Sequence, residues 1–395
     1  MKICQRRLLT TTLLLFTVSL ASAQFPEPFG LWQFDNNTLN NDFFGRTAMA
    51  ATNFTATYAD ESIATHSARA LSVPALTAAN QNLSLPTSFT TNGGGAANRV
   101  NQWSVVMDVK LTSLPAFTAL LQTSTTNADT ADVNLSSTGA LEFSGLTNAI
   151  SGPLPQVTVG KWTRLAITCG NNGAGGPLTV RGYIDGVMVF ENTGEALNGR
   201  YSQQASILLF ADFQGRSSAL SCNSVAYWSS TLSETDVDDL GGPSAGGLTR
   251  FLVVSEDSSG PGTLTQAITD AGSGLGSIGF SRLINGRTIL LTTQYFLGGQ
   301  TIKVDATALP DGITLDANLT SRHFQISSSG NLSLRNLTLT RGKVTGAERG
   351  GSIRSTGAIS LSRCTFRGNS SENGGGAVDQ GATGAIEDCL FADNL

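Results

Sequence analysis

Short runs of alternating apolar and polar residues recur along the first half of the chain. In residues 30–35, Leu31 and Gln33 fall on one face of an extended segment, and Trp32 and Phe34 fall on the other. Further runs of this kind are residues 103–109, 141–143, 178–184, 187–190 and 206–210. Because Gly-, Asn- and Thr-rich turns separate them, they predict many short antiparallel strands, which is typical of a β-sandwich.

Local signals in the same region mark a tight turn and one helix. Asp185-Gly186 divides residues 178–190 into a hairpin, since this dipeptide supplies the positive φ values of a two-residue type I′ turn. Near residue 235, Ser233 is placed as an N-cap with Asp236 at the third helical position, and Gly241 ends the helix. The first half is therefore predicted to contain almost no helix beyond this short segment.

The second half begins with a strand and a short amphipathic helix. Residues 251–255 form an apolar run, and Thr263 is the N-cap candidate of a helix that follows a Gly-rich turn. One face of this helix is apolar, formed by Leu264, Ala267, Ile268 and Ala271. Brief alternating runs then follow at residues 278–280, 288–292, 302–304, 313–316, 323–326 and 332–339.

One passage near residue 350 returns at a fixed interval. Gly350, Gly351, Cys364, Phe366 and Asn369 reappear 25 positions later as Gly375, Gly376, Cys389, Phe391 and Asn394. A repeat of this length indicates stacked units, and one coil of a parallel β-helix has about this many residues. Equal positions would stack ~4.8 Å apart, with Phe and Cys in inward ladders, Asn at a turn, and the glycines at tight corners.

These patterns divide the chain into an all-β domain pair. We expect an antiparallel β-sandwich in residues 24–240 and a short helix followed by a parallel β-helix in residues 249–395. Residues 241–248, rich in Gly, Pro and Ser, are predicted to be a short flexible linker.

The N-terminus has the form of a secretory signal peptide over residues 1–23. Lys2, Arg6 and Arg7 precede an apolar run at residues 8–20, and Ala-Ser-Ala at 21–23 fits a cleavage site. No later apolar run is long enough to span a bilayer. The low charge content of 13% and the 44 glycines suit extracellular β-structure, and the net charge of −5 argues against nucleic acid as a partner.

An ordered set of motifs in residues 24–240 resembles laminin-G-like, concanavalin-A-like jelly-roll domains. The motifs are Trp32-x-Phe34-Asp35, residues 160–168, residues 183–186, and residues 225–228 followed by 232–237. This resemblance implies binding of a carbohydrate or a protein. The Glu-x-Asp-x-Glu strand of the glucanases with this architecture is absent from the sequence. Some relatives hold calcium at one rim, which makes Asp35 and Asp185 weak metal candidates; for Asp185, a turn-forming role is the alternative.

The second domain resembles two groups of bacterial proteins. Residues 251–271, with their Ser-Gly-Pro-Gly turn and short helix, look like the entry of right-handed parallel β-helix proteins. This resemblance implies a right-handed parallel β-helix whose open end is closed by a short capping helix. The Gly-Gly-Ala-Val and Phe-x-x-Asn repeats resemble those of chlamydial polymorphic outer membrane proteins and related surface adhesins. That resemblance implies a passenger displayed at the surface of a Gram-negative-type bacterium, at the cell outer membrane.

Four cysteines follow the signal peptide. Cys169 and Cys222 are candidates for a disulfide pinning the terminal strands of the sandwich, as in some laminin-G-like domains, with two buried thiols as the alternative. Cys364 and Cys389 would lie one coil apart, so we expect stacked free thiols there, although a disulfide is geometrically conceivable.

These observations predict a secreted or cell-surface binding or adhesion protein, non-catalytic, with its jelly roll carried on a β-helix stalk. Its partner would be an extracellular glycan or a surface protein, and calcium is the one cofactor that the resemblance leaves open. The alternative is a carbohydrate-active enzyme, a polysaccharide lyase or hydrolase, that uses the β-helix groove. Because residues 394–395 stop where another coil should begin, we also expect further coils or a partner chain at that end.

Overall fold

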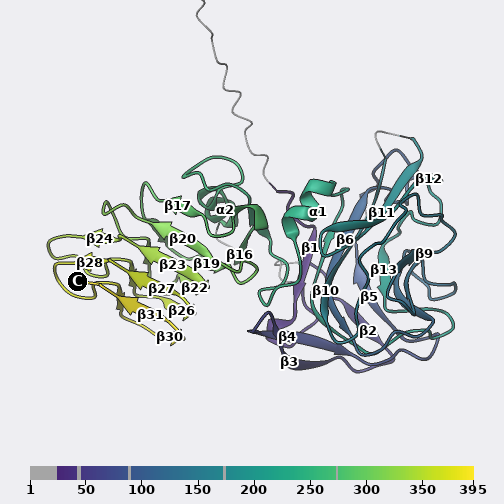
Figure 1. The fold of residues 1–395 in the computed structure, drawn as a ribbon, viewed down its shortest axis with the longest axis horizontal. Helices are drawn as coiled ribbons and strands as arrows, with labels where there is room; N and C mark the ends of the chain where they lie inside the picture. The colour runs from purple at the N-terminus through teal and green to yellow at the C-terminus, as the bar shows by residue number, and fades with distance from the viewer. Residues whose placement is uncertain (1–24, 42–45, 88–89, 172–174, 273–274) are drawn as a thin grey trace, which may run out of the picture.

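The computed structural model describes residues 25–41, 46–87, 90–171, 175–272 and 275–395. The predicted signal peptide therefore lies outside the described residues. The chain forms an antiparallel sandwich, coloured purple to teal, beside a parallel β-helix, coloured green to yellow (Figure 1). This confirms the predicted all-β fold class.

The sandwich consists of two antiparallel sheets. In the first, strands neighbour one another in the order β12 (Val187–Glu195), β11 (Leu178–Ile184), β10 (Trp162–Gly170), β6 (Trp103–Leu111), β14 (Leu220–Trp228), β4 (His66–Val73) and β3 (Thr57–Ile63), with β1 (Gly30–Gln33) also on β14. In the second, the order is β2 (Ala50–Thr52), β5 (Asn82–Pro86), β13 (Ser206–Leu209), β7 (Phe117–Gln122), β8 (Val133–Ser136) and β9 (Leu141–Phe143). All ladders within these two sheets join antiparallel neighbours, as a jelly roll requires.

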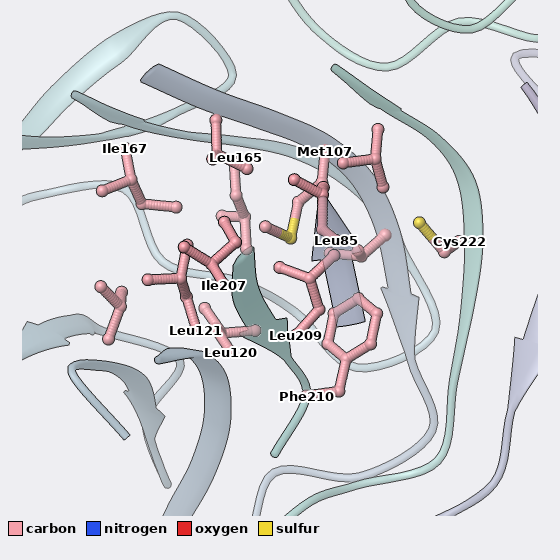
Figure 2. Packing of buried hydrophobic residues seen from close by; sticks show 14 of the residues in the cluster. Leu85, Met107, Leu120, Leu121, Leu165, Ile167, Ile207, Leu209, Phe210 and Cys222 are labelled. Carbon is pink, nitrogen blue, oxygen red and sulfur yellow. The ribbon is translucent and has the colours of Figure 1, made fainter. Parts of the chain in front are cut away.

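Apolar side chains from the two sheets meet in one core. Figure 2 shows Met107 and Leu165 of the first sheet facing Leu121 and Leu209 of the second. The alternation predicted in residues 30–35 is also present, because Trp32 and Phe34 join this core while Leu31 packs on the opposite face of the first sheet. Burial of such large side chains is the main stabilising contribution of the sandwich.

The predicted turn and helix signals have the expected geometry. Asp185 and Gly186 have φ values of 50° and 85°, as a type I′ turn requires. The helix α1 (Glu234–Leu240) begins with a capping box in which Ser233 and Asp236 each accept a hydrogen bond from the other's backbone N–H. A 3₁₀ turn, η1 (Phe34–Asn36), follows β1.

The β-helix is built from three long parallel sheets and one short ladder in the described part of the chain. The first contains β15 (Phe251–Val253), β16 (Leu275–Phe280), β19 (Thr301–Asp305), β22 (Asn331–Arg335), β26 (Ala358–Ser362) and β30 (Gly384–Glu387). The second contains β17 (Thr288–Leu290), β20 (Ile313–Asp316), β23 (Leu337–Thr340), β27 (Thr365–Arg367) and β31 (Leu390–Ala392). The third contains β18 (Tyr295–Leu297), β21 (Phe324–Ile326), β25 (Ile353–Ser355) and β29 (Val378–Gln380), and the short ladder joins β24 (Lys343–Val344) to β28 (Ser370–Ser371).

A helix covers the first coil of this stack. Helix α2 (Leu264–Ala271) starts at Thr263, whose hydroxyl accepts a hydrogen bond from the Gln266 N–H. The four apolar residues expected on one face are buried against the first coils. A second 3₁₀ turn, η2 (Arg282–Ile284), follows β16.

The 25-residue repeat corresponds to two successive coils. Phe366 pairs in register with Phe391, and their rings stack with centroids 4.9 Å apart and planes 7° apart. Asn369 donates a hydrogen bond from Nδ2 to Oδ1 of Asn394 at 3.0 Å, and its own Oδ1 accepts one from the Gly342 N–H at 2.8 Å. Gly350 and Gly375 have φ values of 71° and 64°, which glycine adopts without the steric cost that a Cβ imposes. Through ring stacking, side-chain hydrogen bonds and tight turns, the repeated residues thus join each coil to the next.

The segment predicted as a flexible linker is largely buried between the two parts. The Gln33 side chain donates hydrogen bonds to the carbonyl oxygens of Gly246 at 2.8 Å and Leu248 at 2.6 Å. Leu248 also donates its N–H to Ser224 Oγ at 2.9 Å. Because its backbone groups are bound and its apolar side chains are covered, this connection holds the sandwich against the β-helix rather than acting as a free tether.

Charged side chains extend the contact along the β-helix. Lys303 on β19 pairs with Asp35 at 3.1 Å, and Arg335 at the end of β22 donates to the Ser67 carbonyl oxygen at 3.1 Å. Arg363, one coil further on, reaches the same sandwich hairpin. Successive coils therefore each contribute a basic residue to the interface.

A search of the described residues found no helix both long and apolar enough to cross a membrane.

Candidate functional site

An open hollow of about 510 Å³ lies at the edge of the second sheet of the sandwich. Strands β7, β8 and β9 form its floor, and β12 of the facing sheet contributes to its wall. Its lining combines aromatic and polar side chains, including Phe117, Asn134, Glu142, Phe143 and Phe190. An open concave surface of this composition is the usual form of a ligand site.

Strand register places the polar groups of the hollow side by side. Asn134 on β8 and Glu142 on β9 are directly paired, so their side chains point to the same face. Asn134 donates from Nδ2 to Glu142 Oε2 at 2.9 Å. Asn134 is buried while Glu142 is exposed, so the amide holds the carboxylate in place and the carboxylate faces the solvent.

Phe117 supplies an aromatic surface next to this pair. Its neighbour on β8 is Ser136, which places the ring on the same face as Asn134. The Arg216 guanidinium lies over the Phe117 ring, 3.9 Å from its centroid, and Asp212 holds that guanidinium in a salt bridge at 2.8 Å. Burial alone would raise the pKa of Asp212, but hydrogen bonds from Arg216 and two backbone amides lower it below its ordinary value. The Arg216 guanidinium is thus held by the Asp212 carboxylate and stacked on the Phe117 ring.

A second hollow of about 420 Å³ adjoins the first along the segment after β9. The two share Ala140, Leu141 and Asn148, and the second is otherwise lined mainly by residues 152–156. Asn148 fixes this segment to β12, because Nδ2 donates to the Val189 carbonyl at 2.8 Å and Oδ1 accepts from the Glu191 N–H at 3.1 Å. The bonds of Asn148 therefore hold the wall between the two hollows against β12.

A third hollow, of about 650 Å³, lies beside α1. Its lining is apolar at Ile150, Val187 and Met188 and acidic at Glu234 and Asp238. Asp238 is already paired with Arg282 of the β-helix. No lining residue of this hollow is aromatic, so it lacks the combination of groups found around Glu142.

The two calcium candidates have other partners. Asp35 forms its salt bridge with Lys303, and Asp185 Oδ1 accepts a hydrogen bond from the Arg164 N–H at 2.8 Å within the hairpin turn. Burial raises the pKa of Asp185, although the Arg164 contacts oppose this. Among the residues that the structure describes, no group of three or more His, Cys, Asp or Glu could hold a metal ion. Lys303 thus occupies the Asp35 carboxylate, and a backbone N–H occupies one oxygen of Asp185.

Of the two alternatives for Cys169 and Cys222, a disulfide is contradicted, and the structure has two free, buried thiols. Cys169 on β10 is paired with Trp103 of β6, whereas Cys222 on β14 is paired with Val109 of β6. The two cysteines thus lie on opposite sides of β6 and six residues apart along it, which corresponds to about 20 Å. A disulfide needs Cα atoms within about 7 Å, so this fold cannot form one here. Burial raises the pKa of both thiols.

Cys364 and Cys389 are stacked on successive coils and are also free. The Cys364 N–H donates to Cys389 Sγ at 3.4 Å. A hydrogen bond between the two thiols raises the pKa of Cys364 and lowers that of Cys389. Cys364 is buried, whereas Cys389 is partly exposed.

Three acidic residues of the last coils, Glu348, Asp388 and Asp393, are paired with arginines. Asp388 lies 3.8 Å from Arg363, and Asp393 lies 3.4 Å from Arg367. Glu348 pairs with Arg322 at 2.6 Å and with Arg354 at 2.9 Å. These carboxylates neutralise the charge of neighbouring arginines on the surface of the coils.

Sequence patterns pointed to part of this site but not to its centre. The run 141–143 predicts a strand, and its alternation places Glu142 on the face opposite Leu141 and Phe143. Nothing in the local pattern singled out Phe117 or Asn134. The eight-residue separation of Asn134 and Glu142 is compatible with a tight hairpin, and a register assignment for that hairpin would have paired them.

No family model matches the chain, and a search of curated proteins found no match. Among solved structures, domain 4 of AbnA, an extracellular arabinanase from Geobacillus stearothermophilus, in complex with arabinotriose, is 21% identical with a TM-score of 0.38, covering 54% of this chain and 98% of that one. The binding domain of Paraclostridial mosquitocidal protein 1 is 11% identical with a TM-score of 0.37, covering 53% and 51% of the two chains. Trypanosoma rangeli sialidase in complex with sialic acid is 12% identical with a TM-score of 0.36, covering 55% of this chain and 35% of that one. At these scores the likenesses decide nothing about the function of this chain.

Proposed function

We propose that this chain is a secreted or cell-surface binding protein whose sandwich holds an extracellular glycan in the hollow around Glu142. The β-helix serves as the stalk that carries the sandwich. The observation that carries this proposal is the Asn134–Glu142 pair beside the Phe117 ring in an open hollow. The surface location rests on the predicted signal peptide, and the adhesin role on the resemblance of the repeats to chlamydial surface proteins.

The chemistry of the hollow suits a ligand rich in hydroxyl groups. A carboxylate accepts hydrogen bonds from sugar hydroxyls, while an aromatic ring offers a flat apolar surface to the C–H face of a sugar. Of the residues that line the hollow, Glu142 is the sole acid. Hydrolysis of a glycosidic bond generally requires a second carboxylate across the site, so the lining supports binding rather than cleavage.

Glycan-array screening of the purified chain, followed by calorimetric titration of the best ligand, tests the proposal. Glu142→Gln keeps the shape and removes the charge, and Phe117→Ala removes the ring; each should weaken binding at least about tenfold, the effect of about 1.4 kcal/mol. Glu256→Gln is the matched control, because Glu256 is an exposed acid on the β-helix far from the hollow in the sequence. Unchanged affinity in both hollow variants, or absence of any glycan ligand with capture of a protein instead, would refute a glycan site here.

The enzyme alternative has its own assay. Incubation of the chain with pectin, alginate and β-glucans should release no oligosaccharide products if the protein only binds. Product formation that Glu142→Gln leaves intact would assign catalysis to the β-helix instead.

A further inference from the structure

The hairpin formed by β3 and β4 reaches from the sandwich to the β-helix. Its turn consists of Ala64 and Thr65, with φ values of 47° and 69°. Both values lie in the left-handed region, where a type I′ turn normally uses Asn or Gly, and a β-branched threonine there is strained. Contacts outside the hairpin must therefore help to hold this turn in place.

Those contacts come from two arginines on successive coils. Arg363 Nη1 donates to the Thr65 carbonyl oxygen at 3.1 Å and to His66 Nδ1 at 2.7 Å. Arg335 Nη2 donates to the carbonyl oxygen of Ser67, the next residue along β4, at 3.1 Å. The tip of the hairpin is thus bound through one imidazole and two backbone carbonyls.

The protonation state of His66 decides whether the shortest of these bonds can exist. A guanidinium group can only donate, so His66 Nδ1 must be an acceptor and the proton of the neutral ring must lie on Nε2. A doubly protonated imidazole would have no acceptor for Arg363 and would place a second positive charge beside it. Protonation therefore replaces an attraction with a repulsion.

The charged groups around His66 are two arginines and two aspartates. Each aspartate is paired with one of these arginines, so the aspartates do not outweigh the arginines in their effect on a protonated imidazole. Arg363 and Arg335 face His66 from the β-helix, and Asp305 is the opposing charge. Asp305 is held by Arg335 at 3.2 Å, and Asp388 lies 3.8 Å from Arg363. Burial, followed by the two arginines, lowers the pKa of His66 below its ordinary value. The contact is therefore present at neutral pH and is lost as the pH falls through that lowered value.

We infer that His66 and Arg363 form a pH-sensitive clasp that holds the β3–β4 hairpin on the β-helix at neutral pH and releases it in acid. Release is confined to the tip, because Gln33 and the buried linker continue to join the two parts. The Ala64–Thr65 turn then loses its hold on Arg363, while the bond from Arg335 to the Ser67 carbonyl oxygen and the packing of Ile63 and Ala68 on Ala245 remain. This device is independent of the glycan site, which lies on the other sheet of the sandwich.

Hydrogen–deuterium exchange of the full chain, followed by mass spectrometry, tests the clasp. After correction for the intrinsic pH dependence of exchange, peptides covering residues 57–73 should exchange about ten times faster at pH 4 than at pH 7.5. Peptides from the sandwich core, such as β6, should show no such change. A hairpin that exchanges equally at both pH values would overturn the proposal.

His66→Asn separates titration of this side chain from other effects of acid. The carboxamide oxygen can accept from Arg363 in place of Nδ1 but does not titrate. Loss of the pH step in His66→Asn, whether the hairpin is then protected or open at both pH values, supports the clasp. Because His66 and His323 are the two histidines of the chain, His323→Gln is the matched control and should retain the step. Persistence of the step in His66→Asn would assign it to another group and refute the clasp.

Discussion

Acid should destabilise the β-helix through a single buried histidine. His323 lies inside the coil stack with no exposed surface, where Nε2 is 3.0 Å from the Leu315 carbonyl oxygen and Nδ1 is 3.0 Å from Ser352 Oγ. The carbonyl can only accept, so the neutral ring donates from Nε2 and accepts the Ser352 hydroxyl proton at Nδ1. Burial is the main cause that lowers the pKa of His323 from its ordinary value of 6.5 to about 4.

The size of the effect follows from the two pKa values. Below pH 6.5 the unfolded chain binds a proton at His323, while the folded chain does so only near pH 4. Folding stability therefore falls across this window as the pH falls. The pKa difference corresponds to roughly 3 kcal/mol in total, most of which is lost by pH 4.5.

Amide exchange in β21 measures this loss directly. The Phe324 N–H is bonded to the Ser352 carbonyl oxygen beside the imidazole, so its opening free energy reports on this coil. Tryptophan fluorescence is unsuitable, because all four tryptophans lie in the sandwich. His66→Asn should keep the loss between pH 7.5 and 4.5, and His323→Gln should remove most of the roughly 3 kcal/mol that comes from this imidazole. Equal pH dependence in these two variants would refute the reasoning.

Other side chains give further expectations. Phe366→Ala should lower the free energy of unfolding by about 3–5 kcal/mol because the ring is fully buried. Phe391→Ala should lower it clearly less because its ring is partly exposed. Urea unfolding followed by circular dichroism measures both losses. Asp108→Asn should lower the free energy of unfolding by about 3–5 kcal/mol, because it leaves Arg164 buried beside an uncharged amide. The double variant Asp108→Leu with Arg164→Met should lower it less. Tryptophan fluorescence during urea unfolding compares the two variants, and a larger loss in the double variant would contradict this. Iodoacetamide at pH 7 should alkylate Cys389 before the three buried thiols, since its pKa is lowered; mass spectrometry at successive times gives the order.

Much of the fold could be predicted from local patterns. The alternation around Trp32 fixed which side chains enter the sandwich core, and Ser233 and Thr263 marked the starts of both α-helices in the described residues. The recurrence of Phe366 as Phe391 predicted the parallel stack, because in-register pairing of equal residues follows from a constant coil length.

The candidate site was less accessible to such reasoning. Glu142 could be placed on an outer face, but its partner Asn134 and the ring of Phe117 are brought together by the register of three strands. The disulfide prediction failed for a related reason, since the order of strands puts β6 between Cys169 and Cys222. Strand order depends on how the two sheets close over a shared core, which no single segment encodes.

The sequence by itself determined the periodicities of the chain, which are the two-residue alternation of its strands and the 25-residue interval of its last coils. These depend on backbone geometry and nearest neighbours, so they can be predicted without knowing what packs against what. The tertiary structure alone decided that residues 241–248 are buried rather than free and that His66 meets Arg363 across 297 residues of chain. The physical reason is that burial and charge pairing depend on which surfaces meet, and that is set by the packing of the whole molecule.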